Sequence, residues 1–528
     1  GSLHRTTWGD VAARADRLAA ALRGLGVGKG DRVATFAWNT PRHLELYFAV
    51  PCAGAVLHTL NVRLPAEQIA WIVRHAADTV VFVDRALVPA FAAVLPHVPR
   101  ANQLRFVVMD DAGRGADVRE LPGAIDHEEL LARAAPDAPL PTLDERDAAG
   151  LCYTSGTTGD PKGVLYSHRS TVLHAFGCAM TDSLGIAQND VVLPVVPMFH
   201  ANAWGLAFSG PATGSKLVLP GAKMDGESIY ELLDGEKVTF TAAVPTVWLM
   251  LLQYLESTNK KLPHLKRVVI GGSAVPERIL RAFEENYQVE VVHAWGMTEM
   301  SPLGSLGSMT ENVLAQDRDT IVKYKLKQGR PPFGVEMKTI NDEGVLLPRD
   351  GKTAGRLVVR GPAVAKAYFK GAGGQILDEH GFFDLTRRYY TVLGYDASGA
   401  VVTLREGTNN FICLADDPKQ KGFSVACYHK NLEPFMARGR ELAKEGKNAN
   451  DIFKIREEEV KSKKLPMPDR SVLNVTTGQV NETTGEVTDV YTRFVIYIPY
   501  ATVESTGLPL APLADGAPWI MNPGTHRA

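Results

Sequence analysis

The chain has 528 residues, a length that predicts more than one domain because a domain takes roughly 150 residues. With 45% hydrophobic residues, 22% charged residues and a formal net charge of −2, it has the composition of a folded globular protein and gives no argument for binding nucleic acid or an anionic membrane. No apolar run approaches the ~18 residues of a membrane span, and five cysteines are too few for a disulfide scaffold, so we expect a reducing, cytoplasmic compartment.

Helix and strand signals alternate along most of the chain. Apolar residues at helical spacing predict helices over Thr6–Gly26, Pro41–Ala55 and Pro276–Glu285. Short apolar or β-branched runs predict strands at Asp31–Ala37, Thr79–Asp84, Arg105–Asp110, Ala148–Tyr153, Val191–Pro197, Lys216–Pro220, Val238–Val244, Arg267–Ile270 and Val289–Ala294. This alternation predicts an α/β domain with a largely parallel sheet flanked by helices, whose ligands bind beyond the carboxyl ends of the strands.

A run of small and hydroxylated residues, YTSGTTGDPKG, follows the strand predicted to end at Tyr153. Glycines permit a tight turn in which backbone N–H groups converge on an anion, the hydroxyls add donors, and Lys162 adds a cation. A flexible linker is the alternative, but the run resumes as apolar Val164-Leu165, and it does not match a Walker P-loop. The sequence therefore predicts an anion-binding loop formed by Thr154, Ser155, Gly156, Thr157, Thr158, Gly159 and Lys162.

Three later motifs also follow predicted strands. PMFHANAWG, from residue 197, mixes large and small side chains that suit an apolar cleft, although a single histidine in such a setting is more often structural. GGSA, from residue 271, lets a flat ring approach the backbone or simply makes a strand-to-helix turn. In HAWGMTE, Trp295 offers a stacking face, Thr298 a hydroxyl and Glu299 a hard oxygen ligand for Mg²⁺. A donor-rich loop, a base platform and a metal ligand together predict a nucleotide site.

These motifs resemble those of the adenylate-forming (AMP-binding) superfamily, which includes acyl-CoA synthetases, adenylation domains of peptide synthetases and luciferases. YTSGTTGDPKG resembles its phosphate loop and WGMTE its aromatic-G-x-T-E motif. GRPPFGVE, from residue 329, and GRLVVRGP, from residue 355, resemble two further stretches, with Arg356 where Glu is usual. PMFHANAWG and WNTPRHLELYFAVPCAGAVLHTLN resemble the fatty acyl-CoA synthetase branch, and the likeness covers about residues 3–384.

The resemblance implies a function and a set of site residues. Members use ATP to convert a carboxylic acid, here a medium- or long-chain fatty acid, to an acyl-adenylate and then pass the acyl group to CoA. Thr154 and Glu299 would bind Mg²⁺, and Thr154, Lys162, Thr298 and Glu299 would be catalytic. The other implied nucleotide contacts are Gly272, Ser273, His293, Ala294, Trp295 and Gly296. The acyl tunnel would be bordered by His200, Ala201 and Trp204, and a homodimer is the implied assembly.

The likeness ends abruptly after Asp384. The family continues with T-G-D, whose Asp holds the ribose, whereas Arg387 occupies that position here. No G-R-x-x-D hinge and no C-terminal catalytic lysine of the family is recognisable beyond this point. The likeness also begins several dozen residues into the family's domain. We therefore expect residues 1–384 to be an N-terminally truncated adenylate-forming domain and residues 385–528 to be an unrelated α+β module that replaces the usual small C-terminal domain.

This module carries strand and helix signals of its own. A hairpin is predicted over Tyr389–Glu406, and further elements are predicted as strands Phe423–Tyr428 and Phe494–Tyr500 and as helices Asn431–Lys447 and Ala449–Lys464. The module resembles uncharacterised α+β bacterial proteins, and this resemblance implies no activity for it. Cys413 and Cys427 would pair in an exported protein, but nothing else points outside the cell, so we expect two reduced thiols.

Two hypotheses of different classes follow. The first is an ATP-dependent fatty acid–CoA ligase, whose activity would be impaired if it requires the missing C-terminal domain. The alternative is a catalytically inactive protein that binds ATP and acyl groups, or a fusion product whose two parts have no joint function. Pyrophosphate exchange discriminates between an enzyme and a binding protein.

Overall fold

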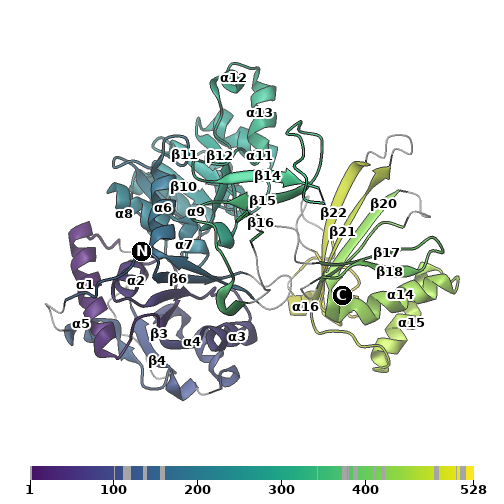
Figure 1. The fold of residues 1–528 in the computed structure, drawn as a ribbon, viewed down its shortest axis with the longest axis horizontal. Helices are drawn as coiled ribbons and strands as arrows, with labels where there is room; N and C mark the ends of the chain where they lie inside the picture. Colours follow the sequence, from purple (N-terminus) through teal and green to yellow (C-terminus); the bar gives the residue numbers. More distant parts are fainter. Residues whose placement is uncertain are drawn as a thin grey trace. The chain divides into compact units, whose positions relative to one another are not determined.

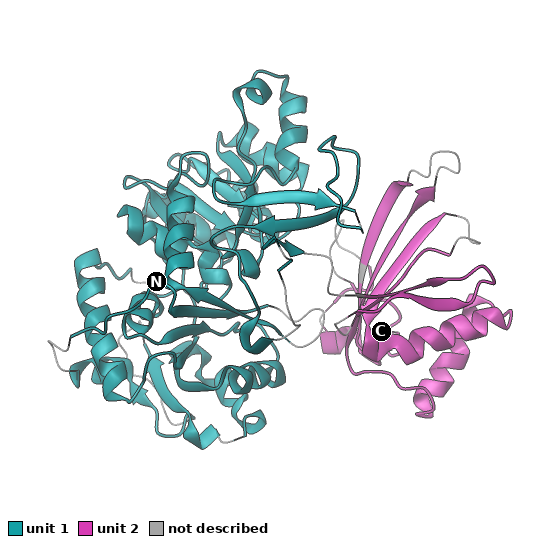
Figure 2. Ribbon diagram, viewed as in Figure 1, with its two compact units in different colours: residues 1–155, 161–384 teal, residues 156–160, 385–528 magenta. Residues whose placement is uncertain are grey.

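The computed structural model of the chain has two compact units (Figure 2). Among the described residues, unit 1 extends from Leu3 to Asp384 and unit 2 begins at Tyr390. The structure describes residues 3–99, 101–110, 120–134, 139–154, 161–341, 343–371, 377–378, 380–384, 390–407, 411–417, 422–480, 487–506, 508–511 and 519–527.

The first sheet of unit 1 has seven strands in the order β5-β4-β3-β1-β2-β6-β7 (Figure 1). Their bounds are β1 (Arg32–Phe36), β2 (Val56–Thr59), β3 (Asp78–Asp84), β4 (Arg105–Met109), β5 (Ile125–Asp126), β6 (Ala148–Tyr153) and β7 (Gly163–Ser167). All neighbours are parallel except β6 and β7, which are antiparallel. The helices of this part are α1 (Trp8–Gly24), α2 (Pro41–Cys52), α3 (Ala66–Ala76), α4 (Val88–Ala92) and α5 (His127–Ala132).

The second sheet of unit 1 has six strands in the order β13-β12-β11-β10-β8-β9, parallel except for the pair β12–β13. Their bounds are β8 (Val191–Pro194), β9 (Lys216–Leu217), β10 (Phe240–Ala243), β11 (Arg267–Ile270), β12 (Glu290–Gly296) and β13 (Leu303–Leu306). The helices are α6 (His168–Ala179), α7 (Ala201–Trp204), α8 (Leu206–Thr213), α9 (Gly226–Gly235), α10 (Pro245–Thr258), α11 (Glu277–Arg281), α12 (Glu311–Leu314) and α13 (Arg318–Leu326), and two short turns are η4 (Ala282–Asn286) and η5 (Thr298–Met300).

A small antiparallel sheet completes unit 1. It consists of β14 (Glu336–Ile340), β15 (Arg356–Arg360) and β16 (Phe383–Asp384). Arg356, which stands where the resembled motif has Glu, forms an ion pair with Asp384, with Nη1 2.7 Å from Oδ2. Both side chains are largely buried, so this pair ties the two neighbouring strands β15 and β16 together.

One hydrophobic core joins the two large sheets. It contains Val33 and Phe82 from the first sheet and Val192 and Phe240 from the second, all at most 1% exposed. Because these side chains share a core, the carboxyl ends of strands in the two sheets are held in fixed relation to each other. The predicted α/β architecture, with mostly parallel sheets and flanking helices, is confirmed.

The element predictions for unit 1 agree with the structure within a few residues at most ends. The prediction at Arg267–Ile270 matches β11 residue for residue. The sequence patterns predict none of the strands β2, β5, β7, β13, β14, β15 and β16. Among the described residues, no helix combines the length and the apolar character that crossing a membrane requires.

Unit 2 is one six-stranded sheet in the order β18-β17-β19-β20-β21-β22. Its elements are β17 (Tyr390–Tyr395), β18 (Val401–Arg405), β19 (Phe411–Leu414), β20 (Phe423–His429), α14 (Glu433–Lys444), α15 (Ala449–Lys461), β21 (Ser471–Val480), β22 (Val487–Tyr497) and α16 (Val503–Thr506). Tyr428 and Leu473 of the sheet pack with Phe435 of α14 in a buried core. The predicted hairpin and both helices are confirmed, whereas the strand predicted over Phe494–Tyr500 ends at Tyr497 and begins earlier.

The two cysteines of unit 2 are bonded to each other, so the expectation of reduced thiols is wrong for this structure. The cause is the register of the sheet. Strands β19 and β20 pair antiparallel with Cys413 directly opposite Cys427, and their Cα atoms are 4.0 Å apart. The sequence separation of 14 residues did not reveal this juxtaposition.

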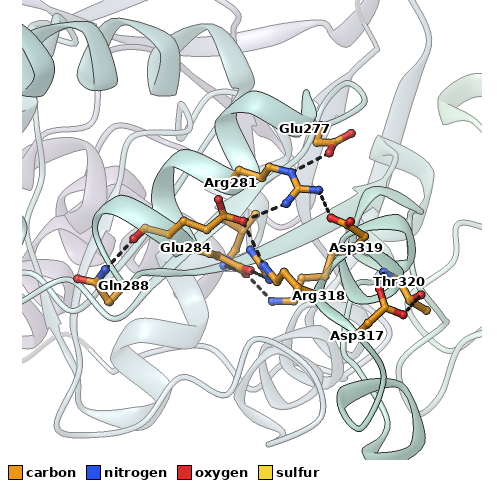
Figure 3. Close-up of polar contacts among 11 residues, drawn as sticks. Glu277, Arg281, Glu284, Gln288, Asp317, Arg318, Asp319 and Thr320 are labelled. Atoms are coloured by element: carbon orange, nitrogen blue, oxygen red, sulfur yellow. Dashed lines mark hydrogen bonds and ion pairs between the residues drawn. The ribbon is translucent and has the colours of Figure 1, made fainter.

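A network of ion pairs fastens α13 to α11 and η4 on the outside of the second sheet (Figure 3). Glu284 lies at its buried end, where it contacts Lys325 at 2.5 Å and Arg318 at 2.8 Å and also accepts the Val291 N–H. Arg281 lies at its exposed end, where it pairs with Glu277 and with Asp319, all three labelled in Figure 3.

The charge of Glu284 is stabilised by this network. Burial alone would raise the pKa of the Glu284 carboxyl, but the hydrogen bond and charge of Lys325, with smaller effects of Val291 and Arg318, bring it below its ordinary value of 4.5. The contribution of this carboxylate to stability is therefore fully present above pH 4.5 and is lost as the pH falls below that value.

Replacing Glu284 by alanine should lower the free energy of unfolding of unit 1 by about 3 kcal/mol, because it leaves the Lys325 ammonium buried without its partner. Urea unfolding followed by tryptophan fluorescence, to which Trp248 beside this network contributes, measures the loss. Glu277→Ala is the matched control, since its half-exposed ion pair should contribute less than about 1 kcal/mol. Equal losses for the two variants would contradict the prediction.

Candidate active site

The predicted anion-binding loop leaves the end of a strand, as expected, and connects β6 to β7. Its base is closed by two hydrogen bonds: the Thr154 N–H donates to the Lys162 carbonyl at 3.0 Å, and the Lys162 N–H donates to the Thr154 hydroxyl at 3.2 Å. The predicted site residues Ser155, Gly156, Thr157, Thr158 and Gly159 lie outside the described residues. The described part of the loop therefore fixes the positions of Thr154 and Lys162.

Thr298 and Glu299 lie in η5, directly after β12. The Tyr166 hydroxyl, on β7 beside the loop, donates to the Thr298 carbonyl at 2.6 Å, which holds η5 against this edge of the first sheet. The Glu299 side chain is 4% exposed and accepts a hydrogen bond from the Tyr368 hydroxyl. The structure thus brings Lys162 and Glu299, which are separated by 137 positions in the sequence, to the same place, and the Lys162 charge acts on the Glu299 carboxyl.

The surroundings of Glu299 have two opposing effects on the pKa of its carboxyl. Burial raises the pKa of the Glu299 carboxyl above its ordinary value. The hydrogen bond from Tyr368 and the charge of Lys162 oppose this rise. Burying a charged carboxylate without such partners costs free energy. The charged form of Glu299 is therefore stabilised by both Tyr368 and Lys162.

An apolar cavity opens beside η5, at the carboxyl ends of β11 and β12. The free space of the cavity together with its open mouth is about 520 Å³. Eight predicted site residues line it, namely His200, Ala201, Trp204, Gly272, Ala294, Trp295, Gly296 and Thr298. The lining residues that sequence reasoning did not assign to the site are Leu184, Val269, Gly271, Met297, Pro302 and Leu303.

A left-handed turn presents Trp204 to this cavity. All four residues of α7, from Ala201 to Trp204, have positive φ values between 43° and 59°. Non-glycine residues rarely adopt this conformation, which costs roughly 1–2 kcal/mol per residue, so the surrounding structure must enforce it. Asn39 holds the preceding segment: its amide donates to the carbonyls of Pro194 and Val196 at 2.8 and 2.9 Å, and its carbonyl accepts the Met198 N–H at 2.7 Å.

Gly271 occupies the point where the Trp204 ring lies against the sheet. A Cβ at this position would lie 3.1 Å from the Trp204 ring and 2.7 Å from the Ala294 carbonyl oxygen. The contact with the carbonyl oxygen is too close for any side chain and the contact with the ring is tight, so the ring packs on bare backbone. The flat ring that lies against this glycine is a side chain of the protein itself.

Of the predicted site residues outside the anion-binding loop, three do not line the cavity. The His293 ring is buried behind β12, where Nδ1 lies 3.2 Å from the Leu326 carbonyl, and burial lowers its pKa. Ser273 is exposed after β11. Glu299 points instead toward Tyr368 and Lys162. The structure therefore separates an apolar cavity from a charged region, and Thr298 lies where the two meet.

The charged region is suited to a magnesium ion. Within the described ranges no cluster of three His, Cys, Asp or Glu side chains could hold a metal by itself. Mg²⁺ does not require one, because it usually keeps several waters and binds one or two protein oxygens together with substrate phosphates. The buried Glu299 carboxylate and the Thr154 hydroxyl are oxygen donors of this kind, so the residues present fit the ion.

The residue that sequence reasoning missed in the charged region is Tyr368. It follows β15 and is 3% exposed. The only sequence signal is its position shortly after the GRLVVRGP motif, and nothing in that motif indicates a contact with Glu299.

Comparison with known proteins identifies the family. A family model described as AMP-binding enzyme matches residues 1–369. The chain belongs to the AMP-binding enzyme family. It is 45% identical over 419 residues to a medium-chain-fatty-acid–CoA ligase of Ectopseudomonas oleovorans, a match covering 79% of this chain and 73% of the relative. It is 44% identical over 385 residues to a long-chain-fatty-acid–CoA ligase of Thermus thermophilus, covering 72% and 69%.

Solved structures of AMP-binding enzymes share the fold. A long-chain-fatty-acid-CoA ligase of Archaeoglobus fulgidus superposes with a TM-score of 0.62 at 24% identity, covering 77% of this chain and 79% of that chain. The likeness supports the adenylate-forming fold with its mixed, mostly parallel sheets. The family match ends at residue 369, before unit 2 begins.

Replacing Lys162 by alanine should weaken ATP binding by about 1.5–3 kcal/mol, or roughly 10- to 150-fold, because a charge-assisted contact with phosphate is lost. Isothermal titration calorimetry with ATP measures the change. Lys223→Ala, which removes an exposed lysine before α9, is the matched control and should leave the affinity unchanged. An unaltered ATP affinity in Lys162→Ala would remove Lys162 from the phosphate site.

Proposed function

We propose that this protein is an ATP-dependent acid–CoA ligase whose substrate is a medium- or long-chain fatty acid. The observation that carries the proposal is the junction of an apolar cavity with a region containing Lys162 and Glu299, with Thr298 between them. An acyl chain suits the first and ATP phosphates suit the second. Identities of 44–45% to medium- and long-chain-fatty-acid–CoA ligases support the same substrate class.

The proposed reaction has two steps. The carboxylate of the acid attacks the α-phosphorus of ATP, the bond to the bridging oxygen of the β-phosphate breaks, and pyrophosphate leaves as the acyl-adenylate forms. The CoA thiol, losing its proton, then attacks the acyl carbonyl carbon, and AMP leaves as the thioester forms. Such phosphorus chemistry needs positioning and neutralised charge rather than a covalent intermediate with the protein.

The residues of unit 1 divide these tasks. Lys162, with the loop that begins at Thr154, holds the phosphates that leave as pyrophosphate. Thr298 contacts the α-phosphate and orients this group for attack by the carboxylate of the acid. Glu299 and Thr154 would hold Mg²⁺, which would further neutralise the phosphate charge. The cavity lined by Trp204 and His200 excludes water from the acyl chain.

A second candidate is a protein that binds ATP and an acyl group without turnover. The observation that favours it is in the sequence: Arg387 stands where the family has its ribose-binding Asp, and neither the hinge motif nor the catalytic lysine is recognisable after Asp384. The first half-reaction uses the residues of unit 1 described above. It is therefore the step that separates the two candidates.

Exchange of labelled pyrophosphate into ATP, in the presence of Mg²⁺ and decanoate or palmitate, tests the proposal. We expect exchange that depends on the acid, and a decrease on the order of 10²–10³-fold in Glu299→Gln, because a charge that orients and neutralises the phosphates is lost. Mass spectrometry of the acyl-CoA product after adding CoA follows the second step. ATP binding with exchange at background would favour the binding protein, and the absence of both would overturn both candidates.

A further inference from the structure

Tyr368 contacts both charged groups of the candidate site. Its hydroxyl donates a hydrogen bond to Oε1 of Glu299. Its ring faces the ammonium group of Lys162, with Nζ 5.2 Å from the ring centroid, which is within the range of a cation–π contact. One buried side chain therefore contacts the proposed metal ligand through its polar tip and the proposed phosphate cation through its face.

The backbone around Tyr368 is fastened to the same two places. The Ala365 N–H donates to the Glu299 carbonyl at 2.7 Å, and the Ser301 hydroxyl donates to the Ala363 carbonyl at 2.7 Å. Tyr368 itself forms a β-bridge with Val164 on β7, two residues after Lys162. The segment from residue 363 to residue 368 thus connects η5 to the strand that follows the phosphate loop.

This arrangement restricts two flexible side chains. A glutamate and a lysine have many rotamers, and holding both in one geometry costs conformational entropy each time a ligand binds. The hydroxyl of Tyr368 engages one carboxylate oxygen of Glu299, and the ring gives Lys162 a favourable position without neutralising its charge. Ligand binding then requires less ordering of either group.

We propose that Tyr368 is a positioning residue that orients Glu299 toward Mg²⁺ and Lys162 toward the phosphates of ATP. The proposal rests on the proposed function, because it assigns Mg²⁺ and phosphate to those two groups. It assigns separate tasks to two parts of one side chain. The hydroxyl acts on the metal ligand, and the ring acts on the phosphate cation.

Two substitutions separate these tasks. Tyr368→Phe keeps the ring over Lys162 and removes the hydroxyl, so the Mg²⁺ concentration that gives half-maximal ATP binding should rise about tenfold. The affinity for ATP in the presence of EDTA should stay within about twofold, since no metal is then held. Tyr368→Leu removes the ring as well. The Mg²⁺ concentration for half-maximal ATP binding should then rise, and the affinity for ATP in EDTA should fall about threefold or more.

The measurement is calorimetric titration with ATP at a series of Mg²⁺ concentrations and in EDTA, with the melting temperature of each variant recorded. Tyr47→Phe is the matched control, because Tyr47 is also fully buried and donates to a backbone carbonyl, that of Met198. It should lower the melting temperature without changing the Mg²⁺ dependence. If Tyr368 had only a structural role, Tyr368→Phe would likewise lower the melting temperature and leave the Mg²⁺ dependence of ATP binding unchanged.

The outcomes distinguish this proposal from the proposed function. If the wild-type protein binds no ATP in the presence of Mg²⁺, the proposed function fails. If it binds ATP and Tyr368→Phe keeps the wild-type Mg²⁺ dependence, the positioning role is overturned. Should Tyr368→Phe not fold, Tyr368→Leu decides the matter, since a wild-type Mg²⁺ dependence in that variant overturns the role equally.

Discussion

Burial of the Glu299 carboxylate is the constraint on which the charged half of the site depends. A carboxylate removed from water is stable only when hydrogen bonds and opposite charge replace its hydration. Tyr368 donates the hydrogen bond and Lys162 supplies the charge, and both come from segments remote in sequence. The site therefore exists only when η5, β7 and the segment after β15 are assembled. The same contacts that make burial tolerable also orient the groups that the proposed reaction uses.

The apolar half of the site depends on a different constraint, the close approach of ring and backbone. Trp204 reaches the cavity from a turn whose residues all have positive φ, and it packs where Gly271 has no side chain. The hydrogen bonds of Asn39 fix the segment that leads into this turn. Strain in the turn is offset by packing in the shared core of the two sheets, which includes Ala203 and contacts Trp204.

Unit 2 is built on other principles. Its strands are mainly antiparallel neighbours, its core closes around Tyr428 and Phe435, and a disulfide joins Cys413 to Cys427 across two strands. No described residue of unit 2 is among the residues to which the proposed chemistry is assigned. The proposed adenylation half-reaction is therefore assigned to residues of unit 1 alone. The pyrophosphate exchange experiment tests those residues directly.

Local sequence determined much of this protein. Apolar and β-branched runs predicted nine of the thirteen strands in the two large sheets, since each follows from which side chains face the core, and the motifs predicted that Lys162, Thr298 and Glu299 belong to one nucleotide site. Tertiary structure alone decided how these residues meet. No local pattern encodes a contact between Tyr368 and Glu299, the opposition of Cys413 to Cys427, or the left-handed turn before Gly205. Each depends on strand register or on packing between segments far apart in the chain, and these are set by the assembled core rather than by neighbouring residues.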